Sequence, residues 1–209
     1  MRGLEDRGAV ALLTIECQNG ATNPDYSSND GLPGQCAERQ IMGRIARLSA
    51  GCRARDIPVF HSKLVHRDDW RGSNLNSPLL GSNRKRRKMI AGNPDSDLHP
   101  ELGAAASDFV LERTHGVTAF YGSALDQLLR NCGVRTVVVT GVSTNLGILG
   151  AVIEAVNRGY TVIVAEDCTA GVWPEAHTFV VEQLLPPLAI IASSDDILTA
   201  LDATGAVNP

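Results

Sequence analysis

Short apolar runs that alternate with amphipathic segments constrain the fold of this 209-residue chain more than any other feature. Residues 9–15 (AVALLTI) and 136–140 (TVVVT) have the length and composition of strands buried on both faces. Elsewhere apolar residues recur at spacings of three and four, as Leu146, Leu149 and Ile153 do, which is the period of an amphipathic helix. Strands that alternate with helices predict an α/β fold with helices on both faces of a mostly parallel sheet.

The remaining elements complete a three-layer α/β/α arrangement. Further strands are predicted at 57–64, 108–111, 160–165 and 188–192, which makes a six-stranded, Rossmann-like sheet. Helices are predicted at 36–55, 122–132, 174–185 and 195–201, and another is expected to be capped by Ser143 or Thr144 and to close at 157–159. Ser194 is expected to cap the last helix, and residues 18–34 are expected to form a long loop.

Composition favours one domain spanning residues 1–209, with a sizeable core. A net charge of −4 gives no overall attraction for nucleic acid or anionic lipid. No run reaches the roughly 18 apolar residues of a membrane span, and the charged first residues do not resemble a signal peptide, so we expect a cytoplasmic protein. Five cysteines without a C-x-x-C pair indicate neither a disulfide framework nor a zinc knuckle.

Residues 65–100 form a polar insert that should carry short helices or cover a binding site. Its basic cluster, residues 84–88 (RKRRK), is interpreted as a solvated loop or a contact with an acidic neighbouring subunit. Trp70 and Trp173 lie in or near segments expected to overhang the binding crevice, although burial between subunits would also suit them.

The segment 140–159 (TGVSTNLGILGAVIEAVNRG) is typical of a strand, a tight turn and a helix. In a parallel sheet such a turn lies at the carboxyl end of a strand, where ligands bind and free backbone N–H groups point into the crevice. Gly147 and Gly150 follow in the first helical turns, and they indicate close approach either of a ligand or of a packed strand.

Four segments together resemble the isochorismatase-like cysteine hydrolase superfamily, which includes isochorismatases, nicotinamidases and N-carbamoyl amidohydrolases. They are residues 11–20 (ALLTIECQNG), 113–125 (RTHGVTAFYGSAL), 138–147 (VVTGVSTNLG) and 164–171 (VAEDCTAG). Their order and spacing extend the resemblance over nearly the whole chain. The resemblance implies a hydrolase fold, a small-molecule substrate, and a dimer or tetramer.

The resemblance also implies a catalytic Asp, Lys and Cys, and this chain departs from the pattern at all three positions. Glu16 stands where the Asp belongs and Gly147 where the nucleophilic Cys belongs. Arg113 is the nearest cation at the Lys position, with Thr114 and His115 as rival alignments. A thiolate mechanism in the family uses these groups as a unit, with backbone N–H groups stabilising the oxyanion.

Other side chains offer alternatives to that assignment. Glu16 is either a carboxylate facing the ligand or a structural ion-pair partner of Arg113. Cys168 is a candidate for a relocated nucleophile, but its acidic neighbours disfavour the thiolate, and Cys17 should face away from the pocket. His61 and His66 lack the spacing of a metal site, so we expect neither a metal nor a cofactor.

The sequence therefore predicts a pocket at the carboxyl ends of the strands that acts on or binds a small polar molecule without a Cys nucleophile. The expected triad positions are Glu16, Arg113 and Gly147, and the expected ligand-binding residues are Gln18, Trp70, His115, Phe120, Ser143, Thr144, Asn145, Leu146, Gly147 and Trp173. One hypothesis is a hydrolase in which Glu16 is the general base and the N–H groups of 144–148 stabilise the oxyanion. The alternative is a non-catalytic binding protein of the same fold.

Overall fold

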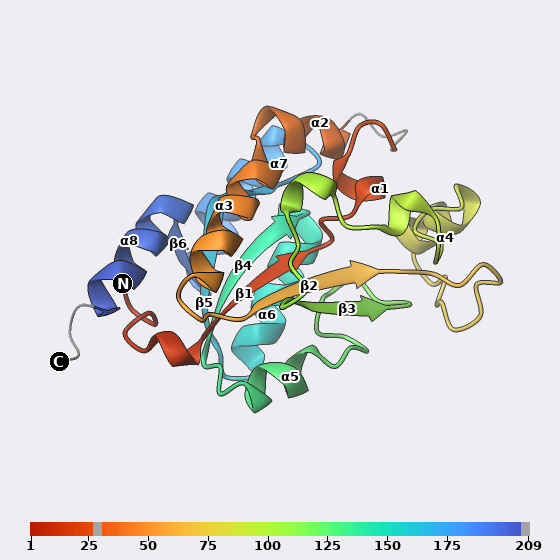
Figure 1. The fold of residues 1–209 in the computed structure, drawn as a ribbon. Coiled ribbons are helices and arrows are strands. Elements are labelled where there is room, and N and C mark those ends of the chain that lie inside the picture. Colours follow the sequence, from red (N-terminus) through yellow and green to blue (C-terminus); the bar gives the residue numbers. More distant parts are fainter. Residues whose placement is uncertain (27–30, 206–209) are drawn as a thin grey trace.

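The computed structural model describes residues 1–26 and 31–205, and its centre is a sheet of six parallel strands between helical layers (Figure 1). The strand order is β3-β2-β1-β4-β5-β6. The strands are β1 (Val10–Ile15), β2 (Val59–Leu64), β3 (Phe109–Arg113), β4 (Thr136–Val142), β5 (Thr161–Ala170) and β6 (Ile190–Ala192). The predicted α/β/α fold with a parallel six-stranded sheet is confirmed.

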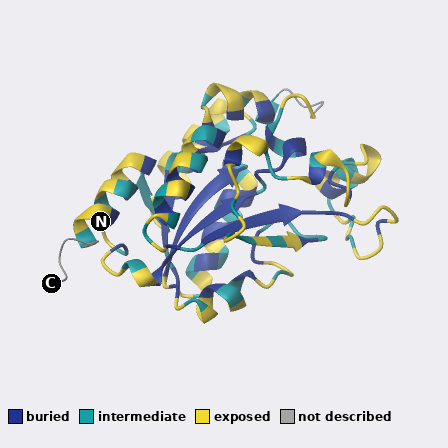
Figure 2. Ribbon diagram, in the orientation of Figure 1, coloured by how far each residue is buried: buried dark blue, intermediate teal, exposed yellow. Residues whose placement is uncertain are grey.

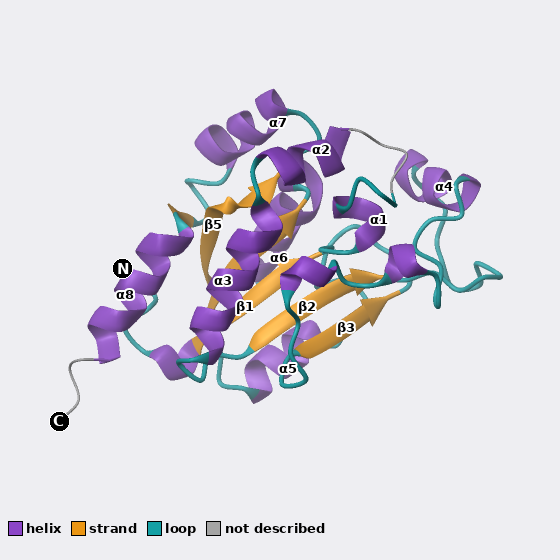
Figure 3. Ribbon diagram, turned by 45° about the horizontal axis from the view of Figure 1, so that its top comes forward, coloured by secondary structure: helices purple, strands orange, loops and turns teal. Residues whose placement is uncertain are grey.

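Helices cover both faces of the sheet, as Figures 1 and 3 show. On one face lie α3 (Ile41–Arg53) and α8 (Ser194–Gly205), and on the other lie α5 (Leu125–Asn131) and α6 (Leu149–Asn157). Along β1, Leu12 belongs to the first core and Leu13 to the second, because successive side chains of a strand point to opposite faces. The central strands are accordingly buried throughout (Figure 2).

The predicted single helix at 36–55 is wrong, because the structure has two helices there. α2 (Gly31–Glu38) ends before Gln40, whose left-handed backbone (φ 53°) breaks the helical path before α3 begins. α1 (Asn19–Thr22) and the start of α2 also occupy part of the predicted loop at 18–34, and residues 27–30 of that loop lie outside the described residues.

β5 continues to Ala170, well beyond the predicted end at residue 165. Its pairing with β4 resumes after an irregularity between Val139 and Gly141, so that Gly141 pairs with Thr169. Cys168 therefore lies inside the strand. The predicted strand end at residue 165, which placed Cys168 beyond the strand, is wrong. At α8 the capping side chain is Ser193, whose Oγ accepts from the N–H of Asp196 at 3.1 Å, and not Ser194.

The insert carries short helices, as predicted. α4 (Pro78–Lys85) starts after Ser77, whose hydroxyl accepts from the N–H of Leu80 at 3.3 Å, and 3₁₀ turns follow at Pro94–Ser96 and Pro100–Leu102. Beyond β5, α7 (Pro174–Phe179) runs into a wider helical turn at Val180–Leu184. Within the described residues, no helix has the length and apolar character needed to cross a membrane.

Candidate functional site

Glu16 is the acidic group at the carboxyl end of the central strand β1. It follows Ile15 directly and adopts a left-handed backbone conformation (φ 51°), which is uncommon for a residue with a side chain. Its N–H donates to the carbonyl of Ser62 at 2.9 Å, so the neighbouring strand β2 holds the residue in this conformation. Such backbone outliers cluster at functional sites, which makes Glu16 a candidate residue.

Arg113 is the cation that pairs with Glu16. It ends β3, its side chain is 1% exposed, and its Nη2 donates to the Glu16 carboxylate, while its Nε donates to the carbonyl of Thr118 at 2.9 Å. The rival candidates for the cation position contact other groups: the carbonyl of Thr114 accepts from Ser73 at 2.8 Å, and the His115 ring lies edge-on to Tyr121. Arg113 is therefore the member of the three that contacts the carboxylate.

The environment of Glu16 shifts its proton affinity. Burial raises the pKa of Glu16, and the charge and hydrogen bond of Arg113 oppose this rise without cancelling it. Its carboxyl group therefore holds a proton at higher pH than an ordinary glutamate does. A guanidinium beside it remains charged and can stabilise the carboxylate once the proton has left.

Gly147 lies in the turn that follows β4, where the Val142–Ser143 peptide bond is cis and residues Thr144–Ile148 form a wide helical turn. A Cβ atom at Gly147 would stand 2.7 Å from the carbonyl oxygen of Val142, which is closer than real side chains approach. The glycine is therefore required by close packing against the strand, and it also lines the cavity described below. Close packing, one of the two roles considered from the sequence, is thus confirmed, and the approach of a ligand stays a prediction.

The backbone N–H groups of this turn are only partly available to a ligand. Those of Leu146 and Ile148 donate to the carbonyl of Ser143, at 3.1 and 3.0 Å. Among residues 1–26 and 31–205, no acceptor binds the N–H groups of Thr144 and Asn145. The expected set of five oxyanion donors is thus smaller than the sequence suggested. No side chain caps the helix here, although Ser143 or Thr144 had been expected to do so.

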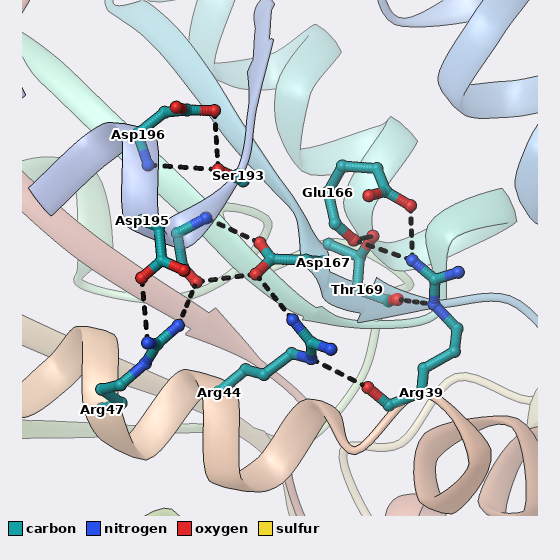
Figure 4. Close-up of polar contacts among 10 residues, drawn as sticks. Arg39, Arg44, Arg47, Glu166, Asp167, Thr169, Ser193, Asp195 and Asp196 are labelled. Atoms are coloured by element: carbon teal, nitrogen blue, oxygen red, sulfur yellow. Dashed lines mark hydrogen bonds and ion pairs between the residues drawn. The ribbon is translucent and has the colours of Figure 1, made fainter. Parts of the chain in front are cut away.

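A network of hydrogen-bonded side chains anchors the turn at Thr144. Thr144 Oγ1 and His177 Nδ1 are 2.8 Å apart, and His177 Nε2 lies 3.0 Å from Glu166 Oε1. Arg39 binds the Glu166 carboxylate and donates to the carbonyl of Thr169 at 2.9 Å (Figure 4). Hydrogen bonding from His177 is the first cause that lowers the pKa of Glu166 to about 2, so this carboxylate is charged at neutral pH. Sequence reasoning missed His177, because an isolated histidine inside a predicted helix carries no signal.

A cavity of about 200 Å³ opens in front of Glu16 and Gly147. Ser143 and Leu146 from the turn also line it, so four of the predicted site residues meet there. Its walls are mostly apolar and come from several parts of the chain. The apolar lining includes Leu32, Leu64, Leu80, Met89, Val117 and Val172. This volume is below the roughly 300–1,000 Å³ of pockets for drug-sized ligands, which indicates a small ligand.

Two cations of the basic cluster line the same cavity. Arg86 and Lys88 follow α4, and Lys88 Nζ donates to the carbonyl of Gly20 at 3.3 Å. Burial lowers the pKa of Lys88, with a further contribution from the charge of Arg86. The sequence had indicated a solvated loop or a contact with a neighbouring subunit. In the structure, part of the cluster also lines the cavity. Composition could not show that these two residues, and not Arg84, Lys85 and Arg87, line the cavity, because the path of the insert decides which side chains reach it.

The other predicted ligand-binding residues lie outside the lining of this cavity. Gln18 is buried and its amide donates to the carbonyls of Leu64 and Ser96, at 3.0 and 2.9 Å, which ties β1 to the insert. Phe120 is buried in the core, Trp70 stacks on His66, and Trp173 is 61% exposed.

Thr144 and Asn145 also contact protein groups rather than the cavity. Thr144 reaches His177, as described above, and the side-chain oxygen of Asn145 accepts from the N–H of Val172 at 3.4 Å. Both side chains therefore hold the turn in place, and neither residue lines the cavity.

The cysteines and histidines occupy structural positions. Cys17 and Cys168 are buried in the core, and burial raises the pKa of both thiols, to which Asp167 adds for Cys168. Cys17 thus faces away from the cavity, as predicted. His61 lies between Thr14 Oγ1 (2.7 Å) and Asp108 Oδ2 (3.0 Å). The part of the chain that the structure describes contains no cluster of three His, Cys, Asp or Glu suited to a metal ion.

Comparison with known proteins places these features in one family. The isochorismatase domain family matches residues 10–196. The uncharacterized isochorismatase family protein YecD of Escherichia coli O157:H7 is 31% identical over 92% of this chain and 96% of its own length. The ureidoacrylate amidohydrolase RutB of Methylorubrum extorquens is 30% identical over 82% of this chain and 73% of its own length.

The fold agrees with these relatives. The structure of an isochorismatase family protein from Burkholderia thailandensis matches with a TM-score of 0.76 and 28% identity, over 93% of this chain and 96% of that protein. In this chain β1 lies in the middle of the sheet. The site combines the acid Glu16 at the carboxyl end of β1 with the tight turn after β4. The protein belongs to the isochorismatase family and has its hydrolase fold.

Proposed function

We propose that this protein cleaves a small polar molecule by general acid–base catalysis at Glu16, without a covalent enzyme intermediate. The observation that carries the proposal is a partly buried carboxyl group with a raised pKa that lines a cavity together with Gly147. Glu16 is the sole acid among the described residues that line the cavity, and none of those residues is a cysteine or a histidine. Proton transfer is therefore the chemistry that this lining supports.

Cleavage of an enol ether suits these groups better than cleavage of an amide. Glu16 gives its proton to the terminal carbon of the C=C bond, and the ether oxygen stabilises the resulting oxocarbenium ion. Water adds to that cation and loses a proton to the Glu16 carboxylate, and the hemiketal then collapses to a carbonyl compound and an alcohol. Arg113 stabilises the carboxylate between the two proton transfers.

An amide or urea makes a different demand on the site. Its carbonyl is a poor electrophile, and family members with the full triad attack it with a thiolate. The relative RutB is named an amidohydrolase, so this substrate class stays the second candidate for the chain. Here water would be the nucleophile and Glu16 the base, with a backbone N–H group of the turn that lines the cavity, such as that of Gly147, as the oxyanion donor.

A non-catalytic binding role is favoured by one specific observation. Arg113 Nη2 already donates to the Glu16 carboxylate, and the pair could serve only to hold the ends of β1 and β3 together. In that case the cavity binds a small polar ligand and releases it unchanged.

The test is a panel of enol ethers, amides and ureas assayed with the wild-type chain and with Glu16→Gln. General acid–base catalysis contributes about 10²–10⁴-fold to rate, so the variant should lose at least about 100-fold in kcat. The wild-type rate should fall as pH rises through the pKa of Glu16, which lies above that of an ordinary glutamate, because the protonated form donates the proton.

Glu112→Gln is the matched control. Glu112 also lies near the carboxyl end of a parallel strand, in β3, but its side chain is 54% exposed, pairs with Lys63 and does not line the cavity. Its substitution should leave turnover within twofold. Full turnover by Glu16→Gln would contradict the proposal, and a panel without any turnover would leave the binding role.

A further inference from the structure

Arg86 and Lys88 give the cavity a positive wall. Both side chains line it, from the segment just after α4, and the charge of Arg86 lowers the pKa of Lys88. No carboxylate of residues 1–26 or 31–205 forms an ion pair with Arg86, whereas the adjacent Arg87 binds Asp68. The acid in the lining, Glu16, is bound by Arg113 from outside the cavity. Among the described residues that line the cavity, no carboxylate therefore pairs with Arg86, in a chain whose net charge is −4.

Much of the remaining lining is apolar. Leu64, Leu80, Met89 and Val117 provide apolar surface. A ligand that satisfies the whole cavity therefore has three parts: an oxyanion at the cations, an apolar body against the leucines and Met89, and a polar group at Glu16. An arginine and a lysine suit carboxylate and phosphate oxygens, to which charge-assisted hydrogen bonds are strong.

We propose that Arg86 and Lys88 form an oxyanion-binding subsite, so that the ligand of this cavity is a small organic carboxylate or phosphate with an apolar body. The inference rests on the proposed function in that both concern the same cavity, but it requires binding only and not turnover. Burial and Arg86 lower the pKa of Lys88, and a bound anion would counteract both effects.

The experiment compares ligands that differ in charge but not in shape. Benzoate and benzamide, acetate and acetamide, and cinnamate and cinnamamide are titrated into the full chain by calorimetry, and phenyl phosphate is added as the phosphate arm. We expect at least one carboxylate or phenyl phosphate to bind at least tenfold more tightly than the neutral amides. The preference should shrink as the salt concentration rises, because Arg86 is exposed to screening.

The variants assign the preference to its residues. Arg86→Gln should reduce the ratio severalfold, and the Arg86→Gln/Lys88→Gln double variant should bring it close to one. Lys85→Gln is the matched control, since Lys85 belongs to the same cluster but is exposed and lies outside the cavity lining. Arg86 is likewise exposed, so its substitution tests the subsite without risk to the fold.

The outcomes separate this inference from the proposed function. Equal affinity for anions and amides, no anion binding in any pair, or a preference that survives in Arg86→Gln/Lys88→Gln would overturn the subsite. Glu16→Gln should keep the preference for anions. If the preference is present and the catalytic panel shows no turnover, the subsite stands and the catalytic proposal fails.

Discussion

At the residue scale, Gly147 stands where the backbone leaves no room for a side chain. A Cβ there would meet the carbonyl oxygen of Val142 at 2.7 Å and Ile15 Cγ2 at 3.4 Å. The first of these is a backbone atom, which cannot rotate away as the end of a side chain can. The turn is therefore closed around a glycine, and a cysteine at this position would require the strand end to move. The thiol-free site is built into the backbone.

We predict that Gly147→Ala lowers the free energy of unfolding by about 1–3 kcal/mol, the usual cost of overpacking. Gly81→Ala is the control: Gly81 lies in α4, a Cβ atom there would have nothing within 4 Å, and alanine should stabilise that helix by up to about 1 kcal/mol. Urea denaturation of the two variants measures both changes. A Gly147→Ala protein as stable as the wild type would show that the turn relaxes without cost.

At the scale of elements, buried charges join the helices to the strand ends. Asp108 precedes β3 and is 1% exposed; it accepts from Arg53 of α3 at 2.9 and 2.6 Å and from the N–H of Ala105 at 2.8 Å. His61 of β2 donates through Nε2 at 3.0 Å, which leaves its Nδ1 to accept from the Thr14 hydroxyl. At the opposite side of α3, Arg44 and Arg47 bind Asp167 and Asp195 (Figure 4). These contacts fix one part of α3 to the start of β3 and another part to β5 and α8.

We predict that Asp108→Asn destabilises the protein by about 3 kcal/mol at pH 7, because Arg53 and His61 lose a buried partner. Burial alone would raise the pKa of Asp108, but hydrogen bonds from Arg53, Ala105 and His61 outweigh it and lower the pKa to about 2. An aspartate of an unfolded chain titrates near pH ~3.9, so the contribution is complete above that value and is lost as pH falls toward 2.

Denaturation of wild type and Asp108→Asn between pH 2 and pH 7 checks this prediction, and the stability difference should narrow only below about pH 4. Asp195→Asn is the surface counterpart, since the Asp195 side chain is 70% exposed and its pair with Arg47 should contribute less than about 1 kcal/mol. A difference that does not change over the whole range would contradict the assigned role of the charge.

At the scale of the whole molecule, the parallel sheet gathers the site from distant parts of the chain. Glu16, Arg113 and Gly147 are separated by about a hundred and by more than thirty residues, yet the strands that precede them all end at one edge. The thiols are distributed differently. Cys17, Cys36, Cys52 and Cys168 are buried in the core, and burial raises the pKa of Cys36 and of Cys52 to about 12.

We predict that a disulfide reagent such as Ellman's labels only Cys132 in the native protein, since it is the one partly exposed thiol of the five. All five should react after unfolding in guanidinium chloride. Labelling of Cys132 should leave ligand binding and any turnover unchanged, because Cys132 follows α5 and does not line the cavity. Loss of function on native labelling would return a thiol to the mechanism.

Local patterns carried most of the fold. The apolar runs at 9–15 and 136–140 predicted β1 and β4 within two residues, because a strand buried on both faces has few polar residues. The break at Gln40 and the extension of β5 to Ala170 were not predictable in this way. Both depend on contacts with remote residues, such as the Arg39 side chain on the Thr169 carbonyl and the pairing of Gly141 with Thr169.

The family and the parallel sheet could be recognised from the sequence, since order, spacing and residue type are properties of the chain; the resemblance also assigns Gly147 to the position of the nucleophile, which stays a prediction. Only the tertiary structure decided that Arg113 and not Thr114 or His115 binds Glu16, and that Arg86 and Lys88 face the cavity. The reason is physical: a side chain's direction and burial follow from how the strand ends and the insert pack together. Local sequence patterns do not encode this packing, so they cannot show which charged side chains meet at the site.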